Sequence, residues 1–250
     1  MKLHQPAADN SNPVHAVTFD CWGTLIYERD TDKGYAVRVD AVQRVAREAG
    51  AAVDNLRARK ALDVAWSRHW QMWCDGVASG VGEIANWSLR DLGIEDFELA
   101  ALLADELASV ALDSEVIALP GASITLERLT KAKVGLALIC DTGFSPGSVV
   151  RQLLDRVGLL DMLSVQVFSD EAGVPKPHAD VFHLALAELD VQPQYAVHVG
   201  DLRHTDIKGA RAIGMGTIRI NDHHDDQTAL PDADAVAQSH AGLRAILGID

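Results

Sequence analysis

Short apolar segments that alternate with helical patterns constrain the fold of this chain more than any other feature. Four of them predict buried strands, because they are short and almost continuously apolar: His15–Phe19, Val134–Ile139, Val165–Phe168 and Tyr195–Val199. Thr217–Ile220 is a fifth candidate. Helical spacing of apolar residues predicts helices between them, over 123–132, 146–157, 179–189 and 206–213. This alternation predicts an α/β fold with a doubly wound parallel sheet, Rossmann-like, covered by helices on both faces.

The interval 34–115 interrupts the alternation. Its apolar residues recur with helical spacing and predict helices near 35–49, 54–75, 82–92 and 96–112, without a convincing strand. We therefore predict an α/β core domain over 13–33 and 116–250, into which an all-helical cap domain over 34–115 is inserted. The polar residues 1–12 predict a flexible tail.

Charge and cysteine content limit the partners and the compartment. The 250 residues carry a formal net charge of −14, which argues against nucleic-acid and anionic-membrane partners, because both need a basic face. A small anionic substrate remains compatible with this charge, since it responds to the local field of a cleft. Three scattered cysteines, with no signal-peptide pattern and no long apolar run, predict a cytoplasmic protein. The sequence leaves monomer and homodimer open.

Polar residues follow the predicted strands at the points where the strands end. Asp20 follows the first strand, 140–143 follow the second, and Lys176 and Asp201 come after the next two. Ligands of open α/β sheets bind outside the carboxyl ends of the strands, so these side chains are expected to converge on one cleft.

Four motifs in this order resemble the haloacid dehalogenase superfamily, of the type with a helical cap. They are FDCWGTL over 19–25, LALICDTG over 136–143, GVPKP over 173–177 and VGDLRHTDIKGA over 199–210. The likeness extends over about residues 14–220, and both the order and the spacing of the motifs fit.

The resemblance implies a hydrolase in which Asp20 is the nucleophile and forms an aspartyl intermediate. Lys176 would keep Asp20 ionised and offset charge on substrate oxygens. Mg²⁺ is the expected cofactor, held by Asp20, the backbone carbonyl of Trp22, Asp201 and Asp206. Asp206 would orient Lys176 or a metal-bound water.

The second motif departs from the family at Cys140, where Ser or Thr is usual. A thiol is a weak hydrogen-bond donor, so Thr142 or the backbone N–H groups of 141–143 would have to help hold substrate oxygens. We expect Cys140 and Thr142 among the catalytic residues. Asp141 and Gly143, together with Thr24 of the first motif, are expected to bind substrate.

Trp22 and Asp201 favour different reactions. Family phosphatases carry a second aspartate, a general acid, where this chain has Trp22, and an indole does not titrate. Dehalogenases lack that acid, which favours dehalogenation. They also lack the metal-binding aspartate, so Asp201 favours a Mg²⁺-dependent phosphatase. We favour a phosphatase of a small phosphorylated metabolite; a metal-independent 2-haloacid dehalogenase is the alternative, and a non-catalytic binding protein of this fold is the third.

The predicted cap carries a tryptophan stripe. Trp66, Trp70 and Trp73 share one face of a helix, with Arg68 and His69 between them. The stripe is compatible with simple packing of the cap and with an aromatic lid over the cleft. In the second case Arg68 would bind a carboxylate or halide, and His69 would supply the proton that Trp22 cannot.

Overall fold

The computed structural model describes residues 13–250, so the predicted tail over 1–12 lies outside the described residues. The chain divides by its internal contacts into two units. Among the described residues, the core unit holds 13–27, Ile117–Asp141 and Leu154–Asp250, and the helical unit holds Glu28–Val116 and Thr142–Leu153. Residues 142–153, which the sequence assigns to the core domain, thus make more of their contacts with the helical unit.

The core unit is built on a six-stranded parallel sheet. Its strands are β1 (Ala16–Phe19), β4 (Gly135–Cys140), β5 (Val165–Phe168), β6 (Ala196–Gly200), β7 (Gly216–Ile220) and β8 (Ala235–Ala237). They pair in the order β5-β4-β1-β6-β7-β8, and every pair is parallel. The sheet order reverses beside β1, so the carboxyl ends of β1, β4 and β6 meet at the position where open α/β sheets bind ligands.

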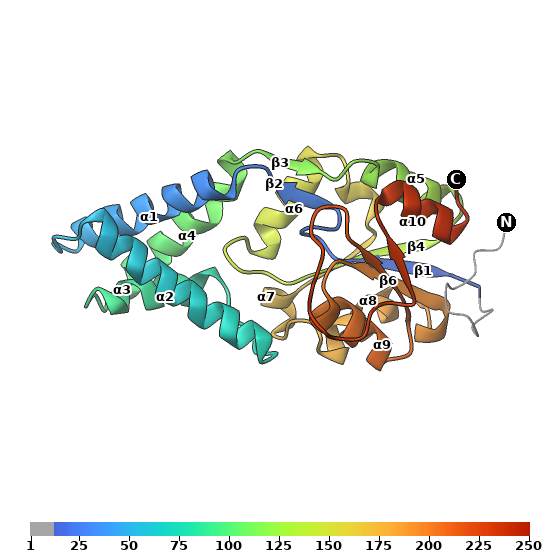
Figure 1. The fold of residues 1–250 in the computed structure, drawn as a ribbon. Helices are drawn as coiled ribbons and strands as arrows, with labels where there is room; N and C mark the ends of the chain where they lie inside the picture. Colours follow the sequence, from blue (N-terminus) through green and yellow to red (C-terminus); the bar gives the residue numbers. More distant parts are fainter. Residues whose placement is uncertain (1–12) are drawn as a thin grey trace. The chain divides into compact units, whose positions relative to one another are not determined.

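Helices cover both faces of this sheet. Figure 1 shows α5 (Ala122–Lys131) and α10 (His240–Leu247) on one face, with α8 (Ala179–Glu188) and α9 (Lys208–Ala212) on the other. Apolar side chains of α8, including Phe182, pack against residues of β4 and β5 in a buried cluster. Short segments complete the unit: α7 (Ser169–Ala172), 3₁₀ turns at Leu160–Met162 and Pro193–Tyr195, and a π-helical turn at Arg203–Ile207.

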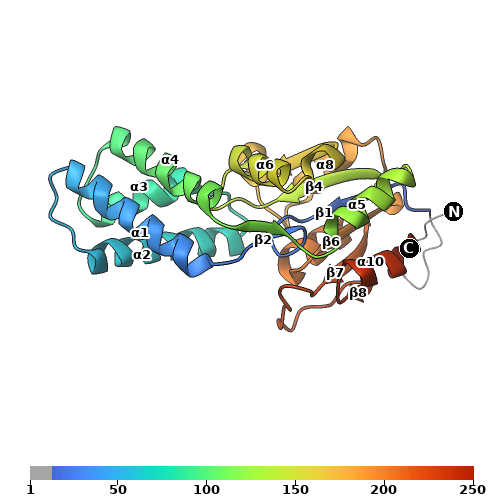
Figure 2. The same ribbon diagram turned by 90° about the horizontal axis from the view of Figure 1, so that it is seen from above.

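The helical unit contains four long helices. They are α1 (Thr31–Glu48), α2 (Asn55–Cys74), α3 (Val81–Asp91) and α4 (Phe97–Asp113), shown from above in Figure 2. Asp30, Asp54 and Asp96 begin three of them, because each side chain accepts a hydrogen bond from a backbone N–H of the first turn. Their apolar faces share one buried cluster that includes Leu62 and Leu103.

Three elements contain residues of both units. β2 (Ile26–Glu28) and β3 (Val116–Ala118) form a two-stranded sheet, and the division between the units passes through both strands. Helix α6 (Gly147–Arg156) begins in the helical unit and ends in the core unit.

The α/β fold class predicted from the sequence is confirmed, and the five predicted strands are present. The helix expected at 206–213 begins earlier, with the π-helical turn at Arg203, because the backbone N–H of Ile207 bonds to the carbonyl of Leu202 five residues back. No helix among residues 13–250 is long and apolar enough to cross a membrane.

Candidate active site

Asp20 and Lys176 form a buried ion pair at the carboxyl edge of the sheet. Asp20 directly follows β1, and its backbone N–H donates to the carbonyl of Val199 in β6 at 2.8 Å. The Lys176 Nζ lies 2.5 Å from Oδ1 of Asp20 and 2.7 Å from Oδ1 of Asp206. The structure therefore brings together the predicted nucleophile, the predicted lysine and one of the predicted acids.

Burial and charge act against each other in this group. Burial raises the pKa of Asp20, and the Lys176 ammonium opposes that rise. Burial alone would lower the pKa of Lys176, but the carboxylates of Asp20 and Asp206 raise it well above its usual value. Burial also opposes ionisation of Asp206, yet Lys176 and His198 hold its pKa far below the usual range. Lys176 is consequently an ammonium and Asp206 a carboxylate.

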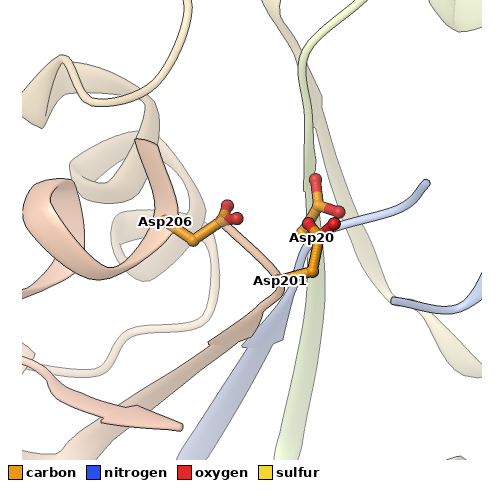
Figure 3. Close-up of side chains that lie close together, drawn as sticks. All are labelled: Asp20, Asp201 and Asp206. Atoms are coloured by element: carbon orange, nitrogen blue, oxygen red, sulfur yellow. The ribbon is translucent and has the colours of Figure 1, made fainter. Parts of the chain in front are cut away.

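Asp201 brings a third carboxylate to this edge. It follows β6, and single oxygens from Asp20, Asp201 and Asp206 all lie within 4.8 Å of one another (Figure 3). Burial, then the charges of Asp20 and Asp206, raise the pKa of Asp201 to about 9. Among the described residues no other residue donates a hydrogen bond to its carboxylate, in contrast to Asp206.

These residues fit a divalent cation. Three carboxyl groups face one ammonium, so the group carries an excess of negative charge once all three are ionised, and a bound cation would neutralise that charge. Carboxylate oxygens are the hard ligands that Mg²⁺ prefers. The loop carrying Trp22 also lies close, since a Cβ on Gly23 would be 2.8 Å from Oδ2 of Asp201. Gly23 adopts a φ of 76°, which suits glycine.

The π-helical turn fixes the orientation of Asp206. The backbone N–H of Leu202 donates to its Oδ2 at 3.0 Å, and Lys176 and His198 both contact its Oδ1. A Cβ on Gly200 would collide with the Asp206 carboxyl group, so a glycine is needed at the end of β6. Asp206 is thus held by hydrogen bonds from several segments.

Asp141 holds the lysine segment. Its Oδ1 accepts a hydrogen bond from the backbone N–H of Lys176 at 2.9 Å. The structure shows that Asp141 fastens the segment carrying the lysine, and its contact with substrate stays a prediction. Because the side chain reaches Lys176 from the end of β4, it joins the second and third motifs.

Cys140 lies at the end of β4 and is buried. A hydrogen bond with the thiol of Cys21, together with burial, raises the pKa of Cys140 well above its usual value. Cys140 is therefore a neutral thiol, and its S–H group is a weak hydrogen-bond donor. Thr24 is also buried, and its Oγ1 has no hydrogen-bond partner among residues 13–250.

The remaining predicted residues lie in the helical unit. Arg68 is exposed there and forms an ion pair with Asp91 at 3.0 Å. The Nδ1 of His69 contacts Oγ of Ser79 at 2.8 Å, and burial lowers the pKa of His69. Their contact with substrate stays a prediction.

The 142–146 loop packs against α2 inside the helical unit. Phe144 stacks on Trp66 with ring centroids 4.5 Å apart, and a Cβ on Gly143 would lie 3.0 Å from Nε2 of His69. Trp66 therefore packs in the helical unit, whereas Trp70 is half exposed.

Ion pairs fasten the acidic motif to the segment after β7. The carboxylate of Asp226 accepts the backbone N–H of Arg203 at 2.7 Å, and the guanidinium of Arg203 contacts Asp232 at 2.8 Å. Arg219 in β7 donates to Asp232 and Asp225, each at 2.7 Å. This network could not be predicted from the sequence, because its carboxylates lie in a segment without regular periodicity.

Thr18 and His198 are further residues of the site that sequence reasoning missed. Both are fully buried in the sheet, and His198 contacts Asp206. The available signal was the occurrence of polar residues inside the two apolar strands, where an unpaired polar group is costly.

A family model for haloacid dehalogenase-like hydrolases matches residues 14–214. The chain belongs to this family of hydrolases. The family model thus spans both units and all four motifs of this haloacid dehalogenase-like hydrolase.

Named relatives of this hydrolase differ in activity. Haloacid dehalogenase-like hydrolase domain-containing protein 3 of Xenopus laevis is 30% identical, over 83% of this chain and 84% of that protein. A ribulose-1,5-bisphosphate 5-phosphatase of Halopiger xanaduensis is 34% identical, over 55% of this chain and 56% of its own. The solved structure of a 2-haloacid dehalogenase from Pseudomonas syringae pv. Tomato DC3000 is 25% identical, with a TM-score of 0.67, over 94% of this chain and 98% of that one. The chain spans about half the length of several curated relatives that it matches, the ribulose-1,5-bisphosphate 5-phosphatase among them.

Proposed function

We propose that this hydrolase is a Mg²⁺-dependent phosphatase that acts on a small phosphorylated metabolite through Asp20. The observation that carries the proposal is the Asp201 carboxylate. It is buried beside two other carboxylates, and no other described residue donates a hydrogen bond to it. A reaction without a metal would leave this acid protonated or repelling the nucleophile, whereas a cation gives it a function.

Each residue of the group then has a chemical role. Asp20 attacks the phosphorus atom, the bond to the leaving oxygen breaks, and an aspartyl phosphate forms that water later cleaves. Lys176 keeps the nucleophile ionised and offsets charge on the phosphoryl oxygens. Bound Mg²⁺ would supply further positive charge for those oxygens, held by Asp20, Asp201, the Trp22 carbonyl and, directly or through water, Asp206.

Trp22 limits which leaving groups suit this site. An indole cannot protonate the departing oxygen, so esters of acidic alcohols should react faster than esters of simple alkanols. In the second motif, Thr142 and the backbone N–H groups of 141–143 are proposed to bind the oxygens that the neutral Cys140 thiol holds weakly. Thr24 is proposed to bind substrate through its buried hydroxyl, which has no hydrogen-bond partner among the described residues.

A second candidate function is hydrolysis of a 2-haloacid. Trp22 favours it, because a halide leaves without a proton. The likeness to a solved 2-haloacid dehalogenase also supports it. In that reaction Asp20 would attack the carbon that carries the halogen, and Asp201 would have no metal to bind.

Two assays distinguish these candidates. We expect phosphate release from an aryl phosphate with Mg²⁺, its loss with a chelator, and its loss in Asp20→Asn and Asp201→Asn. Asp161→Asn, a change at an exposed carboxylate of the core unit, serves as the matched control and should keep full activity. Chloride release from 2-chloropropionate that survives the chelator would contradict the phosphatase proposal and support the dehalogenase.

A further inference from the structure

His198 is a polar side chain in the middle of the core sheet. It lies in β6, with its Cα opposite that of Thr18 in the adjacent strand β1. The residue is fully buried, and its ring packs edge-on against Phe182 with centroids 5.1 Å apart. An apolar residue would fill this place without the cost of burying an imidazole, so the hydrogen bonds of His198 must explain its presence.

The two ring nitrogens of His198 join Thr18 to Asp206. Oγ1 of Thr18 lies 2.7 Å from Nδ1, and Nε2 lies 3.2 Å from Oδ1 of Asp206. A carboxylate only accepts hydrogen bonds, so the ring proton lies on Nε2. The ring is fully buried in the sheet, where a second proton would add a charge that is costly to bury, so it carries one proton. Nδ1 of the neutral ring is then an acceptor, and the Thr18 hydroxyl donates to it.

The hydrogen bonds from Thr18 through His198 end at Asp206. Its Oδ1 accepts from two donors. That oxygen accepts the Lys176 ammonium at 2.7 Å as well as the ring of His198. The other oxygen accepts the N–H of Leu202 at 3.0 Å. Three donors from three segments therefore fix the plane of the carboxylate. A lysine side chain is flexible and its ammonium is a point charge, so Lys176 takes its position from the carboxylates that face it.

We propose that Thr18 and His198 are positioning residues, which hold Asp206 in the orientation that keeps Lys176 against Asp20. The inference rests on the proposed function, in which Asp20 is the nucleophile. Without the Thr18 hydroxyl, Nδ1 is a buried acceptor with no donor. Moving the ring proton to Nδ1 would turn the lone pair of Nε2 toward the Asp206 carboxylate. Either outcome weakens the hydrogen bond that Asp206 receives.

Paired variants separate this role from simple packing. Thr18→Val keeps the shape of the side chain but removes the hydroxyl, and Thr18→Ser restores the hydroxyl. We expect kcat for an aryl phosphate to fall about tenfold or more in Thr18→Val, with little change in KM, as for other partners that orient a catalytic group. Thr18→Ser should recover most of the loss. His198→Leu should resemble Thr18→Val, and His198→Gln, which keeps an N–H, should retain more activity.

A second buried threonine of the same sheet provides the matched control. Thr217 in β7 is fully buried, and its hydroxyl donates to Oδ2 of Asp234 at 2.8 Å. Thr217→Val should lower the melting temperature to a similar extent as Thr18→Val while leaving kcat unchanged. Equal loss of kcat in the two variants would overturn the inference, because it would then reflect general destabilisation.

Nitrogen NMR of histidine-labelled protein tests the proton position without any assay of activity. Wild-type His198 should show the proton on Nε2, and Thr18→Val should change that signal. A wild-type ring with its proton on Nδ1, an unchanged signal in Thr18→Val, or a folded Thr18→Val with kcat within twofold of wild type would each overturn the inference. Absence of phosphate release from the wild type would contradict the proposed function instead, and the NMR result alone would then support or overturn the hydrogen-bonded chain.

Discussion

The Nζ of Lys176 lies 2.5 Å from Oδ1 of Asp20, and the lysine side chain is only 2% exposed. This ammonium is shared with Asp206 and is the positive charge that ion-pairs with both buried carboxylates in the described structure. Its removal should therefore affect stability and activity together.

Lys176→Met should leave two buried carboxylates unpaired. We expect the free energy of unfolding to fall by about 3–5 kcal/mol, the usual cost of breaking a buried ion pair. Phosphate release should fall at least about 100-fold, because a charge that stabilises the developing oxyanion is lost. Urea unfolding and steady-state kinetics measure the two effects. Lys131→Met removes an exposed lysine that pairs with Glu127 and should change both quantities little.

Asp201 should make metal binding depend on pH. Its pKa in the metal-free protein is raised to about 9, so below that pH a cation must displace a proton. The affinity for Mg²⁺ should rise with pH, by at most about tenfold per unit, and level off near pH 9. Titration calorimetry in buffers of different ionisation enthalpy would measure the released proton. Affinity that is constant between pH 6 and 9 would contradict the assignment of Asp201 as a ligand.

The same pKa predicts a pH dependence of stability without metal. Unfolding returns Asp201 to its ordinary pKa of 3.8, so between that value and about 9 the folded state binds more protons than the unfolded state. This group therefore makes the metal-free protein less stable as pH rises through that window. Asp201→Asn should remove this contribution, and thermal unfolding at several pH values would show a flatter dependence.

Gly200→Ala should crowd Asp206. The new methyl group would collide with the Asp206 carboxyl group, which is held by Lys176 and by the backbone N–H of Leu202. Overpacking of this kind costs about 1–3 kcal/mol, and activity should fall because Lys176 loses one of its two carboxylate partners. Gly242→Ala in α10 is the control, since its nearest neighbour would be 3.8 Å away. It should be neutral or slightly stabilising.

The three cysteines should differ sharply in reactivity. Cys74 is exposed, whereas Cys21 and Cys140 are buried, and the pKa of Cys140 is raised well above its usual value. Thiolate is the reactive form, so one thiol per chain should react quickly with Ellman's reagent in the native protein. The other two should react only after unfolding. Cys74→Ser should abolish the fast phase; a fast phase that survives this change would show that the edge of the sheet opens.

The sequence predicted the strands of the sheet well because strands buried on both faces are continuously apolar, as in Val134–Ile139. The convergence of Asp20, Lys176 and Asp201 followed from the rule that ligands bind at the carboxyl ends of strands. Local periodicity also located the four long helices of the helical unit, within a few residues at each end.

Other features depend on contacts that periodicity does not encode. The bond from Lys176 to Asp141 joins residues far apart in the chain, and so does the pairing of Thr18 with His198. The π-helical turn arises from the way Asp206 folds back onto Leu202, which no spacing rule predicts. β8 and α10 were missed because the chain before them is irregular and rich in aspartate.

The ion pairs after β7 bear on how the protein is made. Arg203 is held by Asp226 and Asp232, which are synthesised after every residue of the four motifs. During translation, a nascent chain that has just emerged as far as α9 would contain Asp20, Asp201 and Asp206. It would still lack Asp226 and Asp232, the carboxylates that anchor the π-helical turn. We therefore expect the catalytic edge to reach its final order late, after residue 232 has left the ribosomal tunnel. A fragment cut at the end of the family match, residue 214, would lack the same anchor.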